Sequence, residues 1–177
     1  MFEAEYARKR TTAEEEAGRV RSGDTVFLGG GPLLPKDYAA ALHRRAGELH
    51  GVQVLNYLPL EHIDLLTDPT CGDAFQIQSL FYNKFQQEAQ RLGRCTFIPN
   101  HLRNAARDWS CAVPEYDCMV VTVSPMDKHG YFSLAGATPV ELELLPRARR
   151  VVAEVASHAP RIFGDTALHI SQVDVVL

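Results

Sequence analysis

The sequence is poor in the patterns that would assign a protein to a class at once. It has four cysteines, but no Cys-x-x-Cys pair, which argues against a zinc site and favours free thiols in a reducing cytosol. No apolar run approaches the roughly 18 residues of a membrane span. The first 16 residues, MFEAEYARKRTTAEEE, are charged throughout and lack the apolar segment of a signal peptide. We therefore expect a cytoplasmic protein with no membrane partner. The cysteines are Cys71, Cys95, Cys111 and Cys118.

An excess of charge of one sign is also missing. The formal net charge of −4 arises from 18 basic and 22 acidic side chains, so we expect no nucleic acid as partner. The 177 residues, without repeats or linkers, fit a single domain spanning residues 1–177. Its last five residues, VDVVL, have the pattern of a buried strand. We therefore expect a second domain that this chain does not contain.

What the sequence does contain is an alternation of apolar strand patterns and helix patterns. The most distinct strand is the β-branched run CMVVTV, whose continuous apolar character indicates burial on both faces, as in a parallel sheet. The alternation predicts an α/β fold with an open, mostly parallel sheet flanked by helices. Residues 59–81 have no clear pattern. We expect helices at 13–22, 38–49, 83–93, 101–108 and 138–148, and strands at 24–31, 52–58, 95–99, 117–125, 150–156 and 173–177.

A glycine turn follows the first expected strand, in the stretch FLGGGPLLPKD. Gly29, Gly30 and Gly31 would place bare backbone N–H groups at the carboxyl end of the sheet, where open α/β folds bind ligands. Such groups can hold an anion or a developing oxyanion. The stretch is neither G-x-G-x-x-G nor a P-loop, which disfavours a nucleotide-binding domain. A tight turn that needs positive φ explains the glycines equally well.

The stretch SPMDKHGYFSL, residues 124–134, predicts a β-hairpin near residues 121–134. Asp127 would close the turn and Gly130 would adopt positive φ. A second interpretation is that the hairpin overhangs a pocket and presents Ser124, Met126 or His129 to a ligand. His129 would be the natural general base if water were the acceptor.

The remaining polar residues do not indicate a specific site. Asp64, Asp68 and Asp73 share a stretch with His62, but their spacing fits no metal-binding loop, and a solvated loop is the simpler interpretation. No serine lies in a G-x-S-x-G elbow, so no Ser–His–acid triad is expected. We expect neither a metal nor a bound cofactor.

Several segments, in order, resemble the N-terminal domain of the acetyl-CoA hydrolase/transferase family, which includes 4-hydroxybutyrate and butyrate–acetate CoA-transferases. The resemblance covers nearly the whole chain, and its most specific parts are the hairpin and the APRIFGD…HIS segment. The segments are YARKRTTAEEEAGRVRSGDTV, GGGPLLPKDYAAAL, GRCTFIPNHL, VSPMDKHGYFSL and AEVASHAPRIFGDTALHISQVDVV.

The resemblance implies an enzyme that moves CoA from an acyl-CoA to a small carboxylate such as acetate through a glutamyl-CoA thioester, or that hydrolyses this thioester with water. It also implies that the nucleophilic glutamate lies in a C-terminal domain or subunit, so no catalytic residue is assignable here. This chain would form one wall of a cleft and bind coenzyme A or acyl-CoA as substrate. The expected wall residues are Gly29, Gly30, Gly31, Pro32, Ser124, Met126, His129 and Gly130.

The sequence departs from the family pattern at a few positions, and these bear on the choice of substrate. Ala156 stands where the family has Asn, Gln87 where it often has Arg, and SLAGAT carries one residue more than usual. The alternative function is a non-catalytic ligand-binding or dimerising module that kept the fold. Under either interpretation, a bare sheet edge predicts a homo-oligomer.

Overall fold

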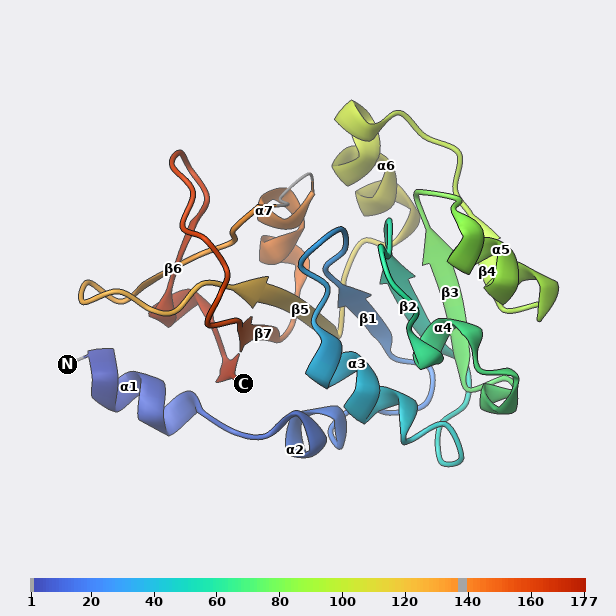
Figure 1. Cartoon of the computed structure of the whole chain (residues 1–177), viewed down its shortest axis with the longest axis horizontal. Helices are drawn as coiled ribbons and strands as arrows, with labels where there is room; N and C mark the ends of the chain where they lie inside the picture. Colours follow the sequence, from blue (N-terminus) through green and yellow to red (C-terminus); the bar gives the residue numbers. More distant parts are fainter. Residues whose placement is uncertain (1, 137–139) are drawn as a thin grey trace.

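A seven-stranded sheet, parallel throughout, forms the centre of the computed structural model, which describes residues 2–136 and 140–177 (Figure 1). The strand order is β4-β3-β2-β1-β5-β7-β9, and a second sheet pairs β6 with β8 antiparallel. The expected fold class is confirmed. The strands are β1 (Thr25–Leu28), β2 (Val52–Asn56), β3 (Phe75–Ser79), β4 (Cys95–Phe97), β5 (Cys118–Val123), β6 (Tyr131–Ser133), β7 (Val151–Val155), β8 (Ala167–His169) and β9 (Val175–Val176).

Helices and the small sheet cover the two faces of the central sheet. Successive residues of a strand point to opposite faces, so Val26 and Leu28 of β1 lie in one core cluster and Phe27 in the other. The first cluster includes residues of α2, α3 and α4, and the second residues of α6, α7, β6 and β8. The helices are α1 (Phe2–Lys9), α2 (Ala13–Ala17), α3 (Lys36–His43), α4 (Asp64–Thr67), α5 (Lys84–Arg91), α6 (Ala105–Ala112) and α7 (Glu141–Leu144). Four short 3-10 turns are η1 (Pro69–Cys71), η2 (Leu102–Asn104), η3 (Leu145–Arg147) and η4 (Ile170–Gln172).

A side-chain cap marks the start of α2. Thr12 accepts from the backbone N–H of Glu15 at 3.1 Å, as its position before an acidic helix predicts. The expected continuation of this helix to residue 22 is wrong, because the carbonyls of Ala17 and Val20 accept from the guanidinium of Arg45, which lies on another segment. Of the helix expected at 138–148, Thr138 and Pro139 lie outside the described residues.

Several elements were not expected, among them β3, α4, β8 and α1. Strand β3 lies within residues 59–81, because its sequence FQIQS places two glutamines at half-buried positions and so lacks a continuous apolar run. Helix α1 was not expected because its sequence is strongly charged, yet Phe2 and Tyr6 pack against the second core cluster. In the described part of the chain, no helix has the length and apolar character needed to cross a membrane.

The hairpin turn is confirmed, and its second arm has two partners. Gly130 has φ 83° and its N–H donates to the carbonyl of Asp127 at 3.0 Å. The first arm bonds to the second through Ser124 N–H, which donates to Ser133 at 2.9 Å. Strand β6 then pairs along its length with β8, about 36 residues further on, so the hairpin is built into a second small sheet.

Candidate functional site

The carboxyl ends of β1 and β5 place the two predicted parts of the site on neighbouring strands. These strands pair in parallel, with Leu28 opposite Val120. Strand β1 leads into the glycine turn and β5 into the hairpin, so both leave the sheet at the same edge (Figure 1). The hollow of about 280 Å³ beside Pro125 and Met126 is completed by α1 and β7. The two parts are therefore neighbours along one edge.

The glycine turn is fixed by close contact with the end of β2. A Cβ on Gly30 would lie 1.9 Å from the carbonyl oxygen of Tyr57, whereas one on Gly29 would meet only ordinary contacts. Gly31 has φ 66°, which confirms positive φ at one of the three glycines. The expectation of bare N–H groups is wrong for Gly29 and Gly31, which donate to Val120 and Leu58 at 3.0 and 3.1 Å. The carbonyl of Val120 belongs to β5, and that of Leu58 to the segment that follows β2.

A buried tyrosine and a buried glutamate lie against this turn. The hydroxyl of Tyr57 donates to the carboxylate of Glu141 at the start of α7, and the backbone N–H of Val140 donates to the same carboxylate at 3.2 Å. Burial raises the pKa of the Glu141 carboxyl above its ordinary value of 4.5, and burial also raises the pKa of the Tyr57 hydroxyl. The pair connects the segment after β2 to the start of α7, next to the glycine turn.

The N-terminus of α3, which follows the glycine turn, is occupied by a side chain of the protein itself. The carboxylate of Glu154, on β7, accepts from the backbone N–H groups of Asp37 and Tyr38 at 3.3 and 2.9 Å. Burial raises the pKa of Glu154 to about 7, although these amide hydrogen bonds favour its charged form. An anion from outside would therefore have to displace Glu154 from this helix end. Pro32, before the helix, is exposed.

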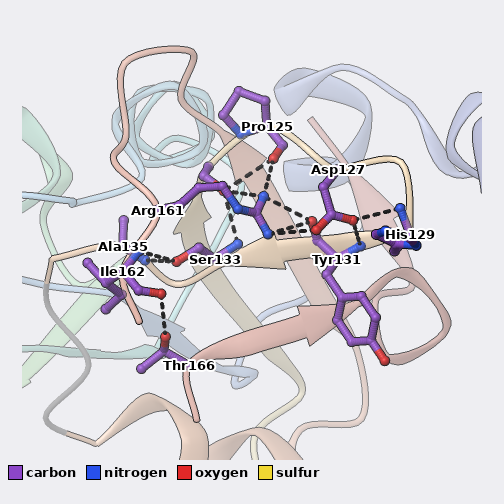
Figure 2. A network of polar contacts seen from close by, with 10 residues as sticks. Pro125, Asp127, His129, Tyr131, Ser133, Ala135, Arg161, Ile162 and Thr166 are labelled. Atoms are coloured by element: carbon purple, nitrogen blue, oxygen red, sulfur yellow. Dashed lines mark hydrogen bonds and ion pairs between the residues drawn. The ribbon is translucent and has the colours of Figure 1, made fainter. Parts of the chain in front are cut away.

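One arginine holds the hairpin (Figure 2). Arg161 donates to the carbonyls of Pro125 and Tyr131 at 3.0 and 3.2 Å and to the hydroxyl of Ser124 at 3.3 Å. It also forms an ion pair of 3.0 Å with Asp127. The carboxylate of Asp127 accepts from two further backbone N–H groups in the hairpin, which contribute to lowering its pKa. The turn is therefore organised around a single guanidinium.

The four predicted hairpin residues occupy different environments. Ser124 is buried, and its hydroxyl accepts from the N–H of Ser133 as well as from Arg161, so its role in the structure is to hold the turn. Met126 is half-buried and His129 is exposed. Gly130 is buried, and a Cβ there would come within 2.8 Å of the ring of Phe2. Contact of Met126 or His129 with a ligand stays a prediction.

The profile of the acetyl-CoA hydrolase/transferase N-terminal domain matches residues 1–177. The chain belongs to this family. A succinyl-CoA:cyclohexane-1-carboxylate CoA transferase of Geobacter metallireducens is 31% identical over 99% of this chain, and a butyryl-CoA:acetate CoA-transferase of Anaerostipes caccae is 25% identical over 99%. The chain spans 40% of the length of either relative.

Solved structures of longer chains contain the same domain. The crystal structure of RipA from Yersinia pestis matches with a TM-score of 0.87 and 28% identity, covering 99% of this chain and 43% of that one. A 4-hydroxybutyrate CoA-transferase from Porphyromonas gingivalis matches with a TM-score of 0.72 at 18% identity, which supports the fold alone. These comparisons confirm the resemblance that the hairpin and the APRIFGD segment indicated.

Within this family domain, sequence reasoning missed the groups that fix the two predicted parts. The APRIFGD segment was one of the most specific parts of the resemblance, but no contact was predicted for its Arg161. Its place beside Pro160 in that segment was the sequence signal that pointed to it. Glu154 and Glu141 gave no such signal, because a lone acid in a strand or helix pattern does not reveal which N–H group or hydroxyl it will meet.

Proposed function

We propose that this chain is a single domain, residues 1–177, of an enzyme that transfers CoA from an acyl-CoA to a small carboxylate, or that releases free CoA when water hydrolyses the enzyme thioester. The reaction would pass through a glutamyl-CoA thioester whose glutamate lies outside the chain. The glutamate carboxylate attacks the acyl-CoA carbonyl, which forms a mixed anhydride and releases CoA thiolate. The thiolate then attacks the glutamyl carbonyl, giving the thioester and releasing the free carboxylate.

The observation that carries this proposal is the match of the family profile to all 177 residues, together with the joining of its two specific segments by Arg161. CoA, acyl-CoA and the carboxylate enter here as substrates, since the relatives are named for CoA transfer.

The buried acids near this edge support a nucleophile from elsewhere. A nucleophilic carboxylate has to reach the acyl carbonyl, but Glu141 is buried and accepts from Tyr57, and Glu154 is bound to the N-terminus of α3. Both carboxyls have raised pKa values, which favours their neutral forms. We therefore assign this domain the task of forming one wall of the substrate cleft, with a C-terminal domain or subunit supplying the glutamate.

The test compares the 177-residue chain with the natively expressed protein, including any residues that follow Leu177. Exchange of labelled CoA between acetate and an acyl-CoA is measured for both, and the thioester is reduced with borohydride and located by peptide mass. We expect exchange only in the longer protein, with the modified glutamate beyond Leu177. Exchange by the short chain alone, or modification of a glutamate within it, would contradict the proposal. A complete native protein without turnover would favour the non-catalytic module.

The exposed apolar residues near strand β4 support a homo-oligomer. The rings of Tyr82 and Phe97 lie 5.6 Å apart, both rings are exposed, and Phe97 belongs to an edge strand. We expect the isolated chain, as a cytoplasmic protein, to associate through this patch. Sedimentation that shows a monomer at every concentration would contradict this expectation.

A further inference from the structure

Three side chains of different chemistry meet at the edge of the sheet opposite the glycine turn. His43 lies in the last turn of α3, Asp68 begins the short turn η1, and Cys71 ends it, just before β3. The ring Nε2 of His43 is 2.9 Å from Oδ2 of Asp68, and these two atoms and Sγ of Cys71 all lie within 4.8 Å of one another. From the sequence, Asp68 was expected in a solvated loop and Cys71 among the free thiols, so their proximity to His43 is a product of the fold.

The separations suit a tetrahedral metal ion. Zinc binds imidazole nitrogen, carboxylate oxygen and thiolate sulfur at about 2.0–2.3 Å, which places its ligand atoms about 3.3–3.8 Å apart. The three atoms could reach that geometry by small side-chain movements. A nitrogen, an oxygen and a sulfur ligand together suit zinc better than magnesium or calcium, which prefer oxygen alone.

The carboxylate of Asp68 is already oriented for such a role. Its Oδ1 accepts from the backbone N–H and the hydroxyl of Thr70 at 2.8 and 2.7 Å, which leaves Oδ2 directed at His43. These hydrogen bonds lower the pKa of Asp68 to about 2, so the ligand is ionised at neutral pH. Outer hydrogen bonds of this kind fix ligand orientation in metal sites.

The residues around these three side chains influence how tightly they would bind an ion. Burial raises the pKa of the Cys71 thiol, so a metal would have to displace its proton on binding. The charge of the buried Arg94, which donates to the carbonyls of Leu65 and Leu66, favours the thiolate but repels a dication. Affinity should therefore be moderate. A hollow of about 150 Å³ between α3 and α4 is lined by His43 but not by Asp68 or Cys71.

We propose that His43, Asp68 and Cys71 form a binding site for zinc or a similar soft divalent cation. The bound ion would connect the end of α3 to the turn that precedes β3, across 28 residues of chain, and would stabilise this half of the sheet. The role is structural and independent of the proposed CoA chemistry, which takes place at the opposite edge.

The test is a titration of the chelator-treated 177-residue chain with Co²⁺ and Zn²⁺. We expect a thiolate-to-Co²⁺ charge-transfer band in the near ultraviolet, displaced by Zn²⁺. Because a ligand that binds only the native state stabilises it, Zn²⁺ at a hundredfold excess over its Kd should raise the Tm by about 5–10 °C. Cys71→Ser should remove the band, and His43→Asn, a change at a half-buried site on α3, should weaken Zn²⁺ binding at least about tenfold.

Two matched control variants test whether another thiol or another His–Asp pair binds the metal. Cys111→Ser removes an exposed thiol, and His50→Asn removes the imidazole of the exposed His50–Asp73 pair; both variants should bind as the unaltered chain does. The proposal is overturned if no charge-transfer band forms, if the band survives in Cys71→Ser, or if His43→Asn binds Zn²⁺ with unchanged affinity. In those cases the cluster is only a His43–Asp68 ion pair beside a buried thiol.

Discussion

The glycine turn and the hairpin leave the same edge of the sheet, but they are held by different means. The turn is held sterically, because Gly30 lies against the backbone of Tyr57 too closely for any Cβ. The hairpin is held by polar contacts, since Arg161 reaches it from 37 residues away. A close backbone contact therefore fixes the conformation of the glycine turn, whereas the hairpin depends on the partly exposed side chain of Arg161, whose contacts water can replace.

The largest effect is expected from breaking the steric contact. Gly30→Ala places a methyl group 1.9 Å from the Tyr57 oxygen, so β1 and β2 must separate locally. We expect a loss of about 3 kcal/mol in the free energy of unfolding, measured by urea denaturation. Gly29→Ala, whose new methyl group meets atoms no closer than 3.5 Å, is the matched control and should cost far less. Equal losses in the two variants would show that the contact does not hold the turn.

A second prediction concerns Glu154, whose buried carboxylate binds the start of α3, the helix that follows the glycine turn. Its native pKa of about 7 lies above the ordinary 4.5, so between these values the native state binds more protons than the unfolded state. The contribution of Glu154 to stability is therefore present at low pH and is lost as pH rises from about 4.5 to 7. We expect Glu154→Gln to remove a decline of about 2 kcal/mol over this range.

Urea denaturation at a series of pH values measures this decline. Glu141 also has a raised pKa from burial, so some decline should remain in the variant. Glu88→Gln, at an exposed position on α5, is the matched control and should keep the full decline. A Glu154→Gln curve parallel to that of the unaltered chain would contradict the raised pKa.

The smallest effect on overall stability is expected at the hairpin. Arg161→Ala removes hydrogen bonds to two carbonyls and an ion pair, but its side chain is 44% exposed, and water can replace part of them. We expect a loss of about 1 kcal/mol, with amide hydrogen exchange at Ser124 and Asp127 accelerated by about fivefold. Arg107→Ala, which loses only a contact to the adjacent Asp108, should leave those amides unchanged. Unchanged exchange in Arg161→Ala would mean that the strand pairing alone holds the hairpin.

The candidate site was predictable where its signal is local. A turn with Asp127 and Gly130 at fixed offsets, or three glycines after an apolar strand, is determined by backbone preferences that neighbouring residues reveal. Strand β3 was missed because alternating glutamines hide a half-buried strand next to the sheet edge. The expectation of bare N–H groups at the glycine turn was wrong because the carbonyls that bind Gly29 and Gly31 come from distant segments, β5 and the residues after β2.

The sequence by itself determined the α/β class, the positions of the glycine turn and the hairpin turn, and the family resemblance, because these depend on residue patterns over short stretches. Only the tertiary structure decided that Arg161 holds the hairpin, that Glu154 occupies the N-terminus of α3, and that His43 meets Asp68 and Cys71. The physical reason is that such contacts join residues distant along the chain. Strand order and packing determine which groups come together, and the local sequence around each group does not indicate its partner.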